Sequence, residues 1–281
     1  MTLHGTQPTR RRHRLLPAAL LLAAACGDSR MPIPAAPDAP QPSFAAVTPE
    51  QWRALAGRRM YFGHQSVGGN IIDGVKAVLA DHPEIPLRVI EATTLDSASG
   101  PGLYHARIGH NGDPSSKVAA FDSIVGGGDP SVAMLKFCFV DVNGHTNPDS
   151  LFAAYQREMS ALHARLPNLV IVHVTMPLTQ TTEGRRDLLM AKIRGQANSY
   201  ELNVIRNRYN ALLRQAYVGK EPVFDLARFE STRPDGSRAF FLRGADTVYK
   251  AASETTDNGG HLTAAGRRGA AEAFLAVLAT L

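Results

Sequence analysis

Residues 132–140 of this chain read VAMLKFCFV and give the clearest indication of its architecture. A stretch that is apolar almost throughout is typical of a strand buried on both faces, as in a parallel sheet covered by helices. A second stretch of this kind, residues 169–176, follows a predicted helix over residues 148–166. Since parallel strands are joined by helical crossovers, the two stretches predict an α/β domain.

Strands and helices alternate on both sides of these two stretches. Further strands are predicted at residues 59–63, 86–92 and 222–226, and further helices at 48–57, 70–80, 117–125, 200–217 and from about 263 to 281. The segments 93–114, 180–196 and 231–256 have no clear period and are predicted to be loops. The alternation predicts one three-layer α/β/α sandwich with a mainly parallel sheet, whose functional sites lie at the carboxyl ends of the strands.

The first 25 residues have the pattern of a secretory signal. Four arginines, the last of them Arg14, precede an apolar run from Leu15 to Ala25 that is too short to span a bilayer as a stable helix. The whole chain has 30 Lys and Arg against 25 Asp and Glu, and removal of the signal leaves 26 against 25. A net charge of +1 gives no reason to expect a nucleic-acid partner.

Cys26 directly follows the small residues Ala23, Ala24 and Ala25. This pattern resembles the lipobox of bacterial lipoproteins, in which the cysteine is lipidated and becomes the N-terminus. The alternative is an ordinary signal that leaves a free thiol, but an unpaired cysteine beside an export signal favours lipidation. We therefore expect a protein of the cell envelope that is attached to the membrane through its lipid only. The other cysteine, Cys138, lies in the apolar strand and is expected to be buried without a disulfide.

The remaining chain divides into a linker and one domain. Residues 30–46 contain five prolines among Ala, Asp and Gln, which predicts a semi-extended tether. A composition of 44% hydrophobic and 20% charged residues is that of a globular protein. The predicted organisation is a signal at residues 1–25, a lipidated cysteine and tether at 26–46, and a catalytic domain at 47–281.

Two distant segments carry candidate catalytic residues. Ser66 lies in the glycine-flanked turn GHQSVGGN, residues 63–70, after the first predicted strand. Such a turn exposes a serine hydroxyl at a helix N-terminus, where a developing negative charge is favoured, although Ser66 could also be a simple N-cap. Asp257 and His261 lie in a glycine-rich loop before the last helix. An imidazole with a nearby carboxylate is what a serine nucleophile needs, and the alternative is a solvated loop histidine.

With these residues in this order, the chain from about residue 59 to 281 resembles the SGNH, or GDSL-like, hydrolase superfamily. The resemblance implies a flavodoxin-like α/β/α fold, with Ser66 as the nucleophile and His261 as the general base. The family's Gly-Asp-Ser block is replaced here by residues 64–66, HQS, while the Gly-Asp-Ser at residues 27–29 has no strand before it. The family acid stands three residues before the histidine, where this chain has Asn258. Asp257 is therefore the favoured acid, and a Ser–His dyad is the alternative.

The same resemblance implies an oxyanion hole that is formed by the serine N–H, a loop glycine and an asparagine side chain. Gly109 and Gly112 are both candidates for the glycine, and Asn143 is the candidate for the asparagine, with Asn111 as its rival. No cofactor and no metal are expected. Residues 141–145 begin like a calcium loop, but the glycine and the acid that such a loop needs further on are missing.

The sequence leaves three functions open. The first is a serine esterase that hydrolyses acyl esters, such as acetyl esters. The second, favoured by the altered HQS block, is a catalytically silent module that binds carbohydrate or peptide, and the third is an envelope glycan O-acyltransferase. Residues 93–114 are polar, unlike the apolar lid of a lipase, and this favours short acyl groups on a polar scaffold such as a polysaccharide. The expected partners are thus an ester substrate and, through the lipid, the membrane.

Overall fold

The computed structural model describes residues 1–2, 32–96 and 100–281. Residues Pro32–Leu281 form one compact unit, and Met1–Met31 form a separate unit of which only the first two residues are described. The predicted signal, Cys26 and the Gly-Asp-Ser at residues 27–29 lie outside the described residues. Within the described ranges, no helix is long and apolar enough to cross a membrane.

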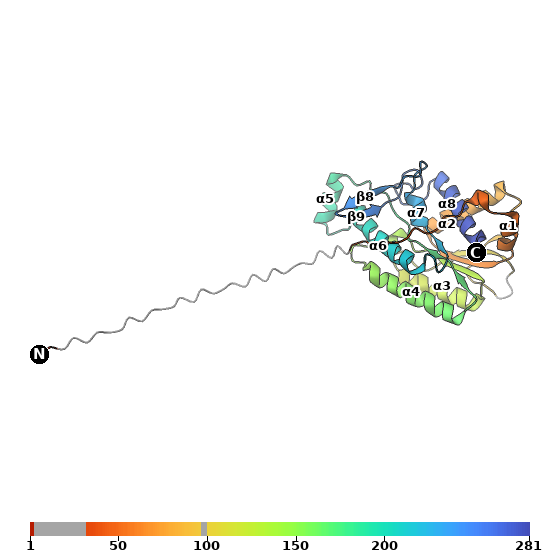
Figure 1. Cartoon of the computed structure of the whole chain (residues 1–281), viewed down its shortest axis with the longest axis horizontal. Coiled ribbons are helices and arrows are strands. Elements are labelled where there is room, and N and C mark those ends of the chain that lie inside the picture. Colours follow the sequence, from red (N-terminus) through yellow and green to blue (C-terminus); the bar gives the residue numbers. More distant parts are fainter. Residues whose placement is uncertain (3–31, 97–99) are drawn as a thin grey trace. The chain divides into compact units, whose positions relative to one another are not determined.

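A parallel sheet forms the centre of the domain, with five strands in the order β2-β3-β1-β4-β5 (Figure 1). The hydrogen bonds from Val172 N–H to the Ala133 carbonyl and from His173 N–H to the Pro222 carbonyl continue this sheet to β6 and β7. The strands are β1 (Arg59–His64), β2 (Val89–Glu91), β3 (Gly102–Arg107), β4 (Val132–Leu135), β5 (Val170–Ile171), β6 (His173–Val174) and β7 (Val223–Phe224).

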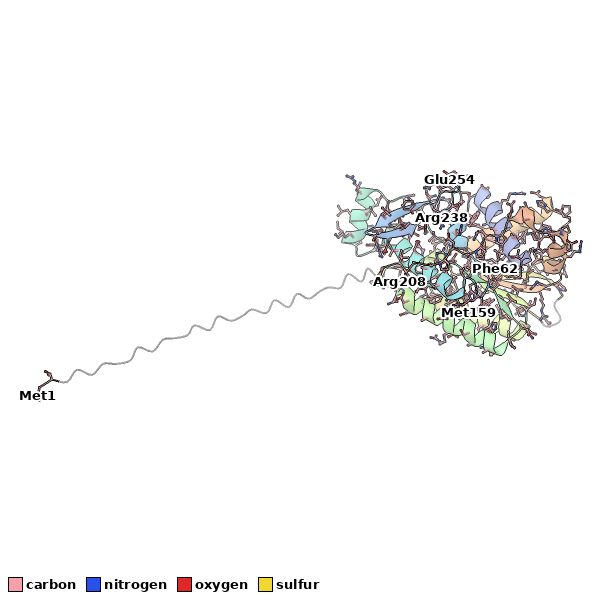
Figure 2. All side chains as sticks on the ribbon, viewed as in Figure 1. Met1, Phe62, Met159, Arg208, Arg238 and Glu254 are labelled. Carbon is pink, nitrogen blue, oxygen red and sulfur yellow. The ribbon has the colours of Figure 1, made fainter. Side chains whose placement is uncertain are left out.

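Helices cover both faces of the sheet. Met60 and Phe62 of β1 belong to one hydrophobic core, and Tyr61 between them belongs to the other, because alternate residues of a strand point to opposite faces. Phe62 lies in the interior (Figure 2). The first core is covered by α1 (Pro49–Ala56), α2 (Ser66–Asp81) and α8 (Ala264–Ala279), and the second by α3 (Pro114–Gly128), α4 (Pro148–Arg165) and α6 (Ser199–Tyr217). The predicted three-layer α/β/α sandwich is confirmed.

One central strand lies where the sequence predicted a loop. β3 falls within residues 93–114 and pairs with β1 over six residues, from Arg59–Gly102 to His64–Arg107. Its sequence, GLYHAR, contains polar residues and follows Gly100 and Pro101, so it has no apolar period. The pairing with β1 and β2 buries it all the same, which is a tertiary effect that a local pattern does not contain.

The other two predicted loops also contain regular structure. The segment 180–196 contains α5 (Arg185–Ile193), a helix in which no residue is buried. The segment 231–256 contains an antiparallel hairpin of β8 (Phe240–Arg243) and β9 (Asp246–Tyr249), and the short helix α7 (Leu226–Ser231) ends at its start. Of these elements, α5 and the hairpin lie at one end of the domain (Figure 1).

The described part of the proline-rich segment packs on the domain instead of standing away from it. Asp38 forms an ion pair with Arg228 at 2.8 Å, and Ala39 is only 1% exposed. Phe44 packs on Trp52, with 5.2 Å between the ring centroids. The compact unit thus begins at Pro32, within the predicted tether. The part of the predicted tether before Pro32 lies outside the described residues.

Candidate active site

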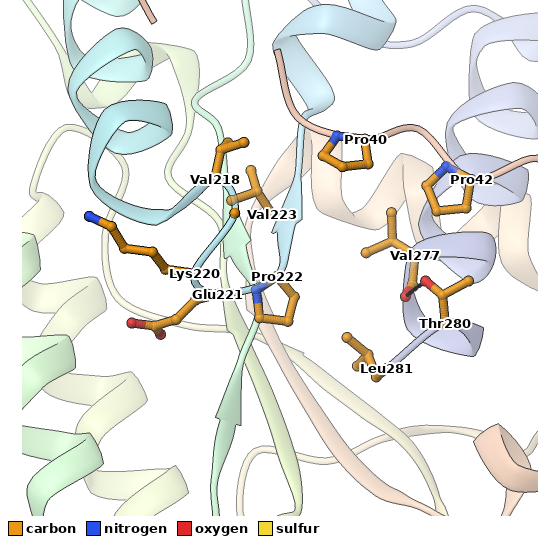
Figure 3. A pocket seen from close by; sticks show the side chains of 11 residues that line it. Pro40, Pro42, Val218, Lys220, Glu221, Pro222, Val223, Val277, Thr280 and Leu281 are labelled. Atoms are coloured by element: carbon orange, nitrogen blue, oxygen red, sulfur yellow. Dashed lines mark hydrogen bonds between the residues drawn. The ribbon is translucent and has the colours of Figure 1, made fainter. Parts of the chain in front are cut away.

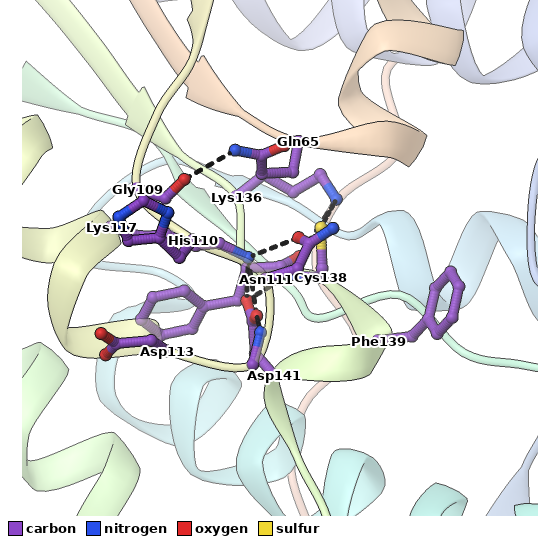
Figure 4. Close-up of polar contacts among 12 residues, drawn as sticks. Gln65, Gly109, His110, Asn111, Asp113, Lys117, Lys136, Cys138, Phe139 and Asp141 are labelled. Carbon is purple, nitrogen blue, oxygen red and sulfur yellow. Dashed lines mark hydrogen bonds and ion pairs between the residues drawn. The ribbon is translucent and has the colours of Figure 1, made fainter.

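Four segments of the chain lie at the carboxyl edge of the sheet, where parallel sheets bind their ligands. They are residues 64–66 after β1, 108–113 after β3, 136–141 after β4, and 256–262 before α8. Hydrogen bonds from Gln65 to Gly109 and from Gly112 to Asp141 join the first three (Figure 4). The fourth contacts α2 and Phe139. The structure therefore brings the two distant candidate segments to one place.

Ser66 begins α2 directly after β1. The N-cap of α2 is Gln65, whose side chain donates to the carbonyls of Ile108 and Gly109 at 3.0 and 2.9 Å. The alternative in which Ser66 is a simple N-cap is therefore wrong. Ser66 Oγ lies 3.8 Å from Cys138 Sγ, and the residue is half-buried at the helix N-terminus. The helix dipole favours a negative charge at this position.

In the loop after β3, the Gly109 N–H and the side-chain amide of Asn111 have no acceptor among the described residues. Gly109 (φ 61°) and Gly112 (φ 82°) both have the left-handed conformation that favours glycine. The N–H of Gly112 donates to Asp141 Oδ1 at 2.9 Å and is thus occupied. Among the described residues, the N–H of Gly109 has no acceptor, and Asn111 uses only its oxygen, which accepts from Lys117 at 3.2 Å. Gly109 and Asn111 are the better oxyanion candidates of this loop.

Asn143, the other asparagine candidate, stabilises a local turn after η2 (Phe139–Asp141). Its side-chain oxygen accepts from the N–H of His145, and its own N–H donates to Thr146, both at 2.9 Å. The residue is exposed, and none of its described hydrogen bonds reaches Ser66 or the loop after β3. The geometry therefore favours Asn111 over Asn143.

A buried ion pair that the sequence did not predict holds the loops together. Lys117 Nζ lies 2.6 Å from both carboxylate oxygens of Asp141, and both side chains are fully buried. The carboxylate also accepts from the N–H groups of Gly112 and Cys138. A buried carboxylate with this many donors is satisfied, and it fixes the loop after β3 to the loop after β4. In the sequence, Lys117 and Asp141 stand in separate segments, and neither local pattern indicates that the two side chains pair.

His261 is positioned from two sides. The N–H of the next residue, Leu262, donates to Asn70 Oδ1 at 3.2 Å, and Asn70 lies one helical turn beyond Ser66 on α2. The His261 ring packs edge-on against Phe139, with 5.8 Å between centroids, and Phe139 follows Cys138 in the chain. Among the described residues, Ser66 Oγ has no hydrogen bond to His261. Catalytic hydrogen bonds are often long in the absence of substrate.

Asp257 closes the loop that carries His261. Its Oδ1 accepts from the N–H groups of Gly259 and His261, each at 2.9 Å, and its own N–H donates to the His261 carbonyl at 2.7 Å. A Cβ at Gly259 would lie 3.3 Å from Asp257 Oδ1 and 3.6 Å from His261 Nδ1, so the carboxylate and the ring are neighbours. The carboxylate nevertheless binds the backbone of His261 and not its ring.

A pair of buried histidines lies beneath the first turn of α2. His64 Nε2 and His105 Nδ1 are 3.2 Å apart, and both residues are buried. Burial, followed by the neighbouring His105 and Lys136, lowers the pKa of His64 to about 3. Burial also lowers the pKa of His105. Such rings are poor proton acceptors, so neither His64 nor His105 is suited to act as the base.

Cys138 is buried, as predicted, and is a free thiol. Its sulfur contacts Ser66 on one side and Lys136 Nζ, at 3.6 Å, on the other. Lys136 is fully buried and also donates to the Phe137 carbonyl at 3.1 Å. The Cys138 thiol thus lies between the Ser66 hydroxyl and the Lys136 amino group.

The domain also has a groove that contains none of the candidate catalytic residues. A groove of about 370 Å³ lies at the opposite edge of the sheet, between the proline-rich segment and the C-terminus (Figure 3). It is lined by residues such as Pro40, Pro222 and Leu281, and by none of the predicted catalytic residues. Within the described ranges, no group of three or more His, Cys, Asp or Glu side chains is arranged to hold a metal ion.

Comparison with known proteins gives solved structures only: no model of a protein family and no curated protein matches the chain. The lipase/acylhydrolase from Enterococcus faecalis is 12% identical, with a TM-score of 0.45 over 78% of this chain and 93% of that chain. A carbohydrate esterase family 3 protein from Talaromyces cellulolyticus is 14% identical, with a TM-score of 0.39 over 76% and 92%. The periplasmic domain of a lipopolysaccharide acetyltransferase from Salmonella ser. Paratyphi A is 12% identical, with a TM-score of 0.39 over 83% and 96%. Likeness at this level does not define the reaction of this chain.

Proposed function

We propose that the protein is a serine esterase that transfers an acyl group from an ester to Ser66 and then to water. One observation carries the proposal: Ser66 lies at the start of α2, while contacts with Asn70 and Phe139 hold His261 at the same edge of the sheet. A hydroxyl, a base and unpaired N–H donors at one helix N-terminus are the parts that acyl transfer requires.

The reaction begins with attack of Ser66 Oγ on the ester carbonyl, and His261 accepts the hydroxyl proton. The carbonyl oxygen becomes an oxyanion, which the N–H groups of Ser66 and Gly109 and the side-chain amide of Asn111 stabilise. The alcohol then leaves with the proton from His261. A water molecule attacks the acyl-enzyme by the same route, and it releases the acid and restores Ser66.

Asp257 has two roles in this scheme. Its hydrogen bonds to the backbone keep the His261 loop closed, and its negative charge stabilises the imidazolium that forms when Ser66 loses its proton. Because the carboxylate binds the backbone, the first role is the larger one. The site then works nearly as a Ser–His dyad.

The cell envelope is the proposed location, with Cys26 as the site of lipidation. The signal pattern of residues 1–25 and the small residues before Cys26 support this. The proposed substrates are short acyl esters, such as acetyl groups, on a polysaccharide. The polar, exposed residues around the site, such as His110 and Asn111, support a polar acyl carrier over a lipid tail.

Labelling with a fluorophosphonate probe, together with acetyl ester hydrolysis, tests the proposal. Wild type should be labelled and should hydrolyse the ester, whereas Ser66→Ala should do neither while keeping its circular dichroism spectrum. Ser29→Ala, in the Gly-Asp-Ser at residues 27–29, is the matched control and should behave as wild type. Hydrolysis by a folded Ser66→Ala protein would overturn the assignment. A wild type that is never labelled would instead favour the silent binding module.

A further inference from the structure

The exposed apolar side chains of the domain are concentrated on two elements. In the described residues from 32 onward, five large apolar side chains are exposed, and four of them belong to α5 and β8. The exposed fractions are 58% for Leu189, 68% for Ile193, 50% for Phe240 and 68% for Leu242. Scattered single apolar residues are normal on a surface, but such a concentration marks an interaction site.

Two apolar side chains of α5, Leu189 and Ile193, are largely exposed, whereas Leu188 and Met190 are half-buried. None of its nine residues is buried, although Leu189 and Ile193 lie four positions apart and thus on one face. An isolated helix this short is marginal in water. Most helical stability comes from packing of an apolar face, so we expect another surface to complete α5.

The β8–β9 hairpin presents a second apolar face near the first. Phe240 and Leu242 lie two positions apart in β8 and so share one face, while Phe241 points the other way and packs on Tyr200 with 4.9 Å between the rings. The start of α6 also holds the segment before α5, because Ser199 donates to Glu183 at 2.7 Å. α5 and the hairpin are therefore neighbours (Figure 1).

Exposed cations surround the apolar residues of α5. Arg185 and Arg186 precede Leu189 by four and three positions, and Lys192 follows it by three, so all three cations lie beside its face. The single acid of the helix, Asp187, accepts the Gly184 N–H at the helix start. Basic and apolar residues on one short exposed helix are typical of segments that lie in the interface of an anionic membrane.

We propose that the exposed faces of α5 and β8 dock on the surface of a bilayer that contains anionic lipids. The charge favours this occupant over a second copy of the chain, because a two-fold interface at this face would bring the same arginines together. Anionic headgroups neutralise Arg185, Arg186 and Lys192, and the apolar side chains enter the headgroup layer. The proposed docking requires neither the lipid on Cys26 nor the chemistry at Ser66.

Fluorescent reporters on the proposed surface test the docking directly. Leu189→Cys and Leu242→Cys, each in the full chain with Cys26→Ser, are labelled with an environment-sensitive thiol dye; Cys138 is buried and should not react. Gln156→Cys on α4 is the control position, since it is exposed and lies on a helix that is not part of the proposed surface. Vesicles of phosphatidylcholine and phosphatidylglycerol should shift the emission to the blue at the two test positions and leave it unchanged at the control. No shift at either test position, or an equal shift at all three, would overturn the proposal, as would a shift that depends on protein concentration without vesicles.

The contribution of charge is tested with matched pairs of substitutions. Arg185→Gln with Arg186→Gln should lower the vesicle affinity by roughly 5-fold for each arginine, as expected for about 1 kcal/mol per cation near an anionic surface. The control pair, Arg53→Gln with Arg157→Gln, removes the same charge from exposed positions on α1 and α4 and should change the affinity less than about twofold. Equal losses in both pairs would show that net charge alone governs binding and would contradict a defined docking surface.

Discussion

The two sides of the candidate site are held in place by different means. On the serine side, residues 64–66, 108–113 and 136–141, the fully buried Lys117–Asp141 pair binds the loops to each other. On the histidine side, residues 256–262, the exposed Asp257 binds two backbone N–H groups. The buried acid next to this loop, Glu230, accepts the Leu178 N–H at 2.7 Å and forms no ion pair with any described residue.

The difference concerns what each side contributes to the reaction. Oxyanion donors act through preorganisation, and a buried ion pair provides it because neither partner can leave without a large desolvation penalty. The base, in contrast, has to approach Ser66 only when substrate is bound, and a loop closed by backbone hydrogen bonds can still shift. Substitutions on the serine side should therefore affect both stability and turnover, and those of exposed residues in the histidine loop mainly turnover.

The largest expected effect is on the histidine side. His261→Ala should lower kcat by at least about 10³-fold, because it removes the group proposed to accept the Ser66 proton. The thermal unfolding midpoint should change little, since the ring is only half-buried. Ester hydrolysis and differential scanning calorimetry give the two values. The control, His145→Ala, removes an exposed histidine from the loop after η2 and should keep full turnover.

On the serine side, Lys117→Met should destabilise the fold by about 3–5 kcal/mol, because it leaves Asp141 as an unpaired buried charge. Urea denaturation measures this loss. The double variant Lys117→Met with Asp141→Leu should recover part of the stability and none of the turnover, because the Gly112 N–H then has no acceptor and the loop of Gly109 and Asn111 is no longer fixed. A double variant with normal turnover would show that the ion pair only stabilises the fold.

The histidine side should respond to pH through Glu230. Burial raises the pKa of this carboxyl from its ordinary value of 4.5 to about 8. Between these two values the folded state retains a proton that the unfolded state has lost, so stability falls as pH rises, by up to about 1.4 kcal/mol per pH unit. Glu230→Gln has no proton to lose, and its stability relative to wild type should increase from about pH 5 to pH 8 in urea denaturation. Glu50→Gln, an exposed control whose partner Arg53 stays charged throughout this range, should show no such trend.

The sequence predicted the layers of the fold and the candidate segments at the carboxyl edge of the sheet, and the reasons are local. Apolar runs such as residues 132–140 and the capping box at Thr48 are complete within a few residues. The position of Ser66 follows from its place after the first strand. β3 was missed because its burial comes from pairing with β1 and β2, which no local period records.

The loop network of the site could not be predicted for a related reason. Lys117 and Asp141 are 24 residues apart, and their pairing appears only once β3 and β4 lie on either side of β1. The choice between Gly109 and Gly112 depended on which N–H that carboxylate occupies. Sequence patterns identify residue types with the right chemistry, but partners that are brought together by the sheet decide which of them remain free.

The smallest expected effect separates the two roles of Asp257. In Asp257→Asn the amide oxygen can still accept from the N–H groups of Gly259 and His261, so the loop should stay closed and kcat should fall by less than about 10-fold. Asp257→Ala removes both hydrogen bonds and should cost more, because His261 is then free to leave the site. If Asp257→Asn instead lowered kcat by about 10⁴-fold, the carboxylate would have to bind the imidazole in the reacting complex, as the acid of a full triad does. The ratio of kcat for the two variants thus measures how far the histidine side depends on loop closure and how far on charge.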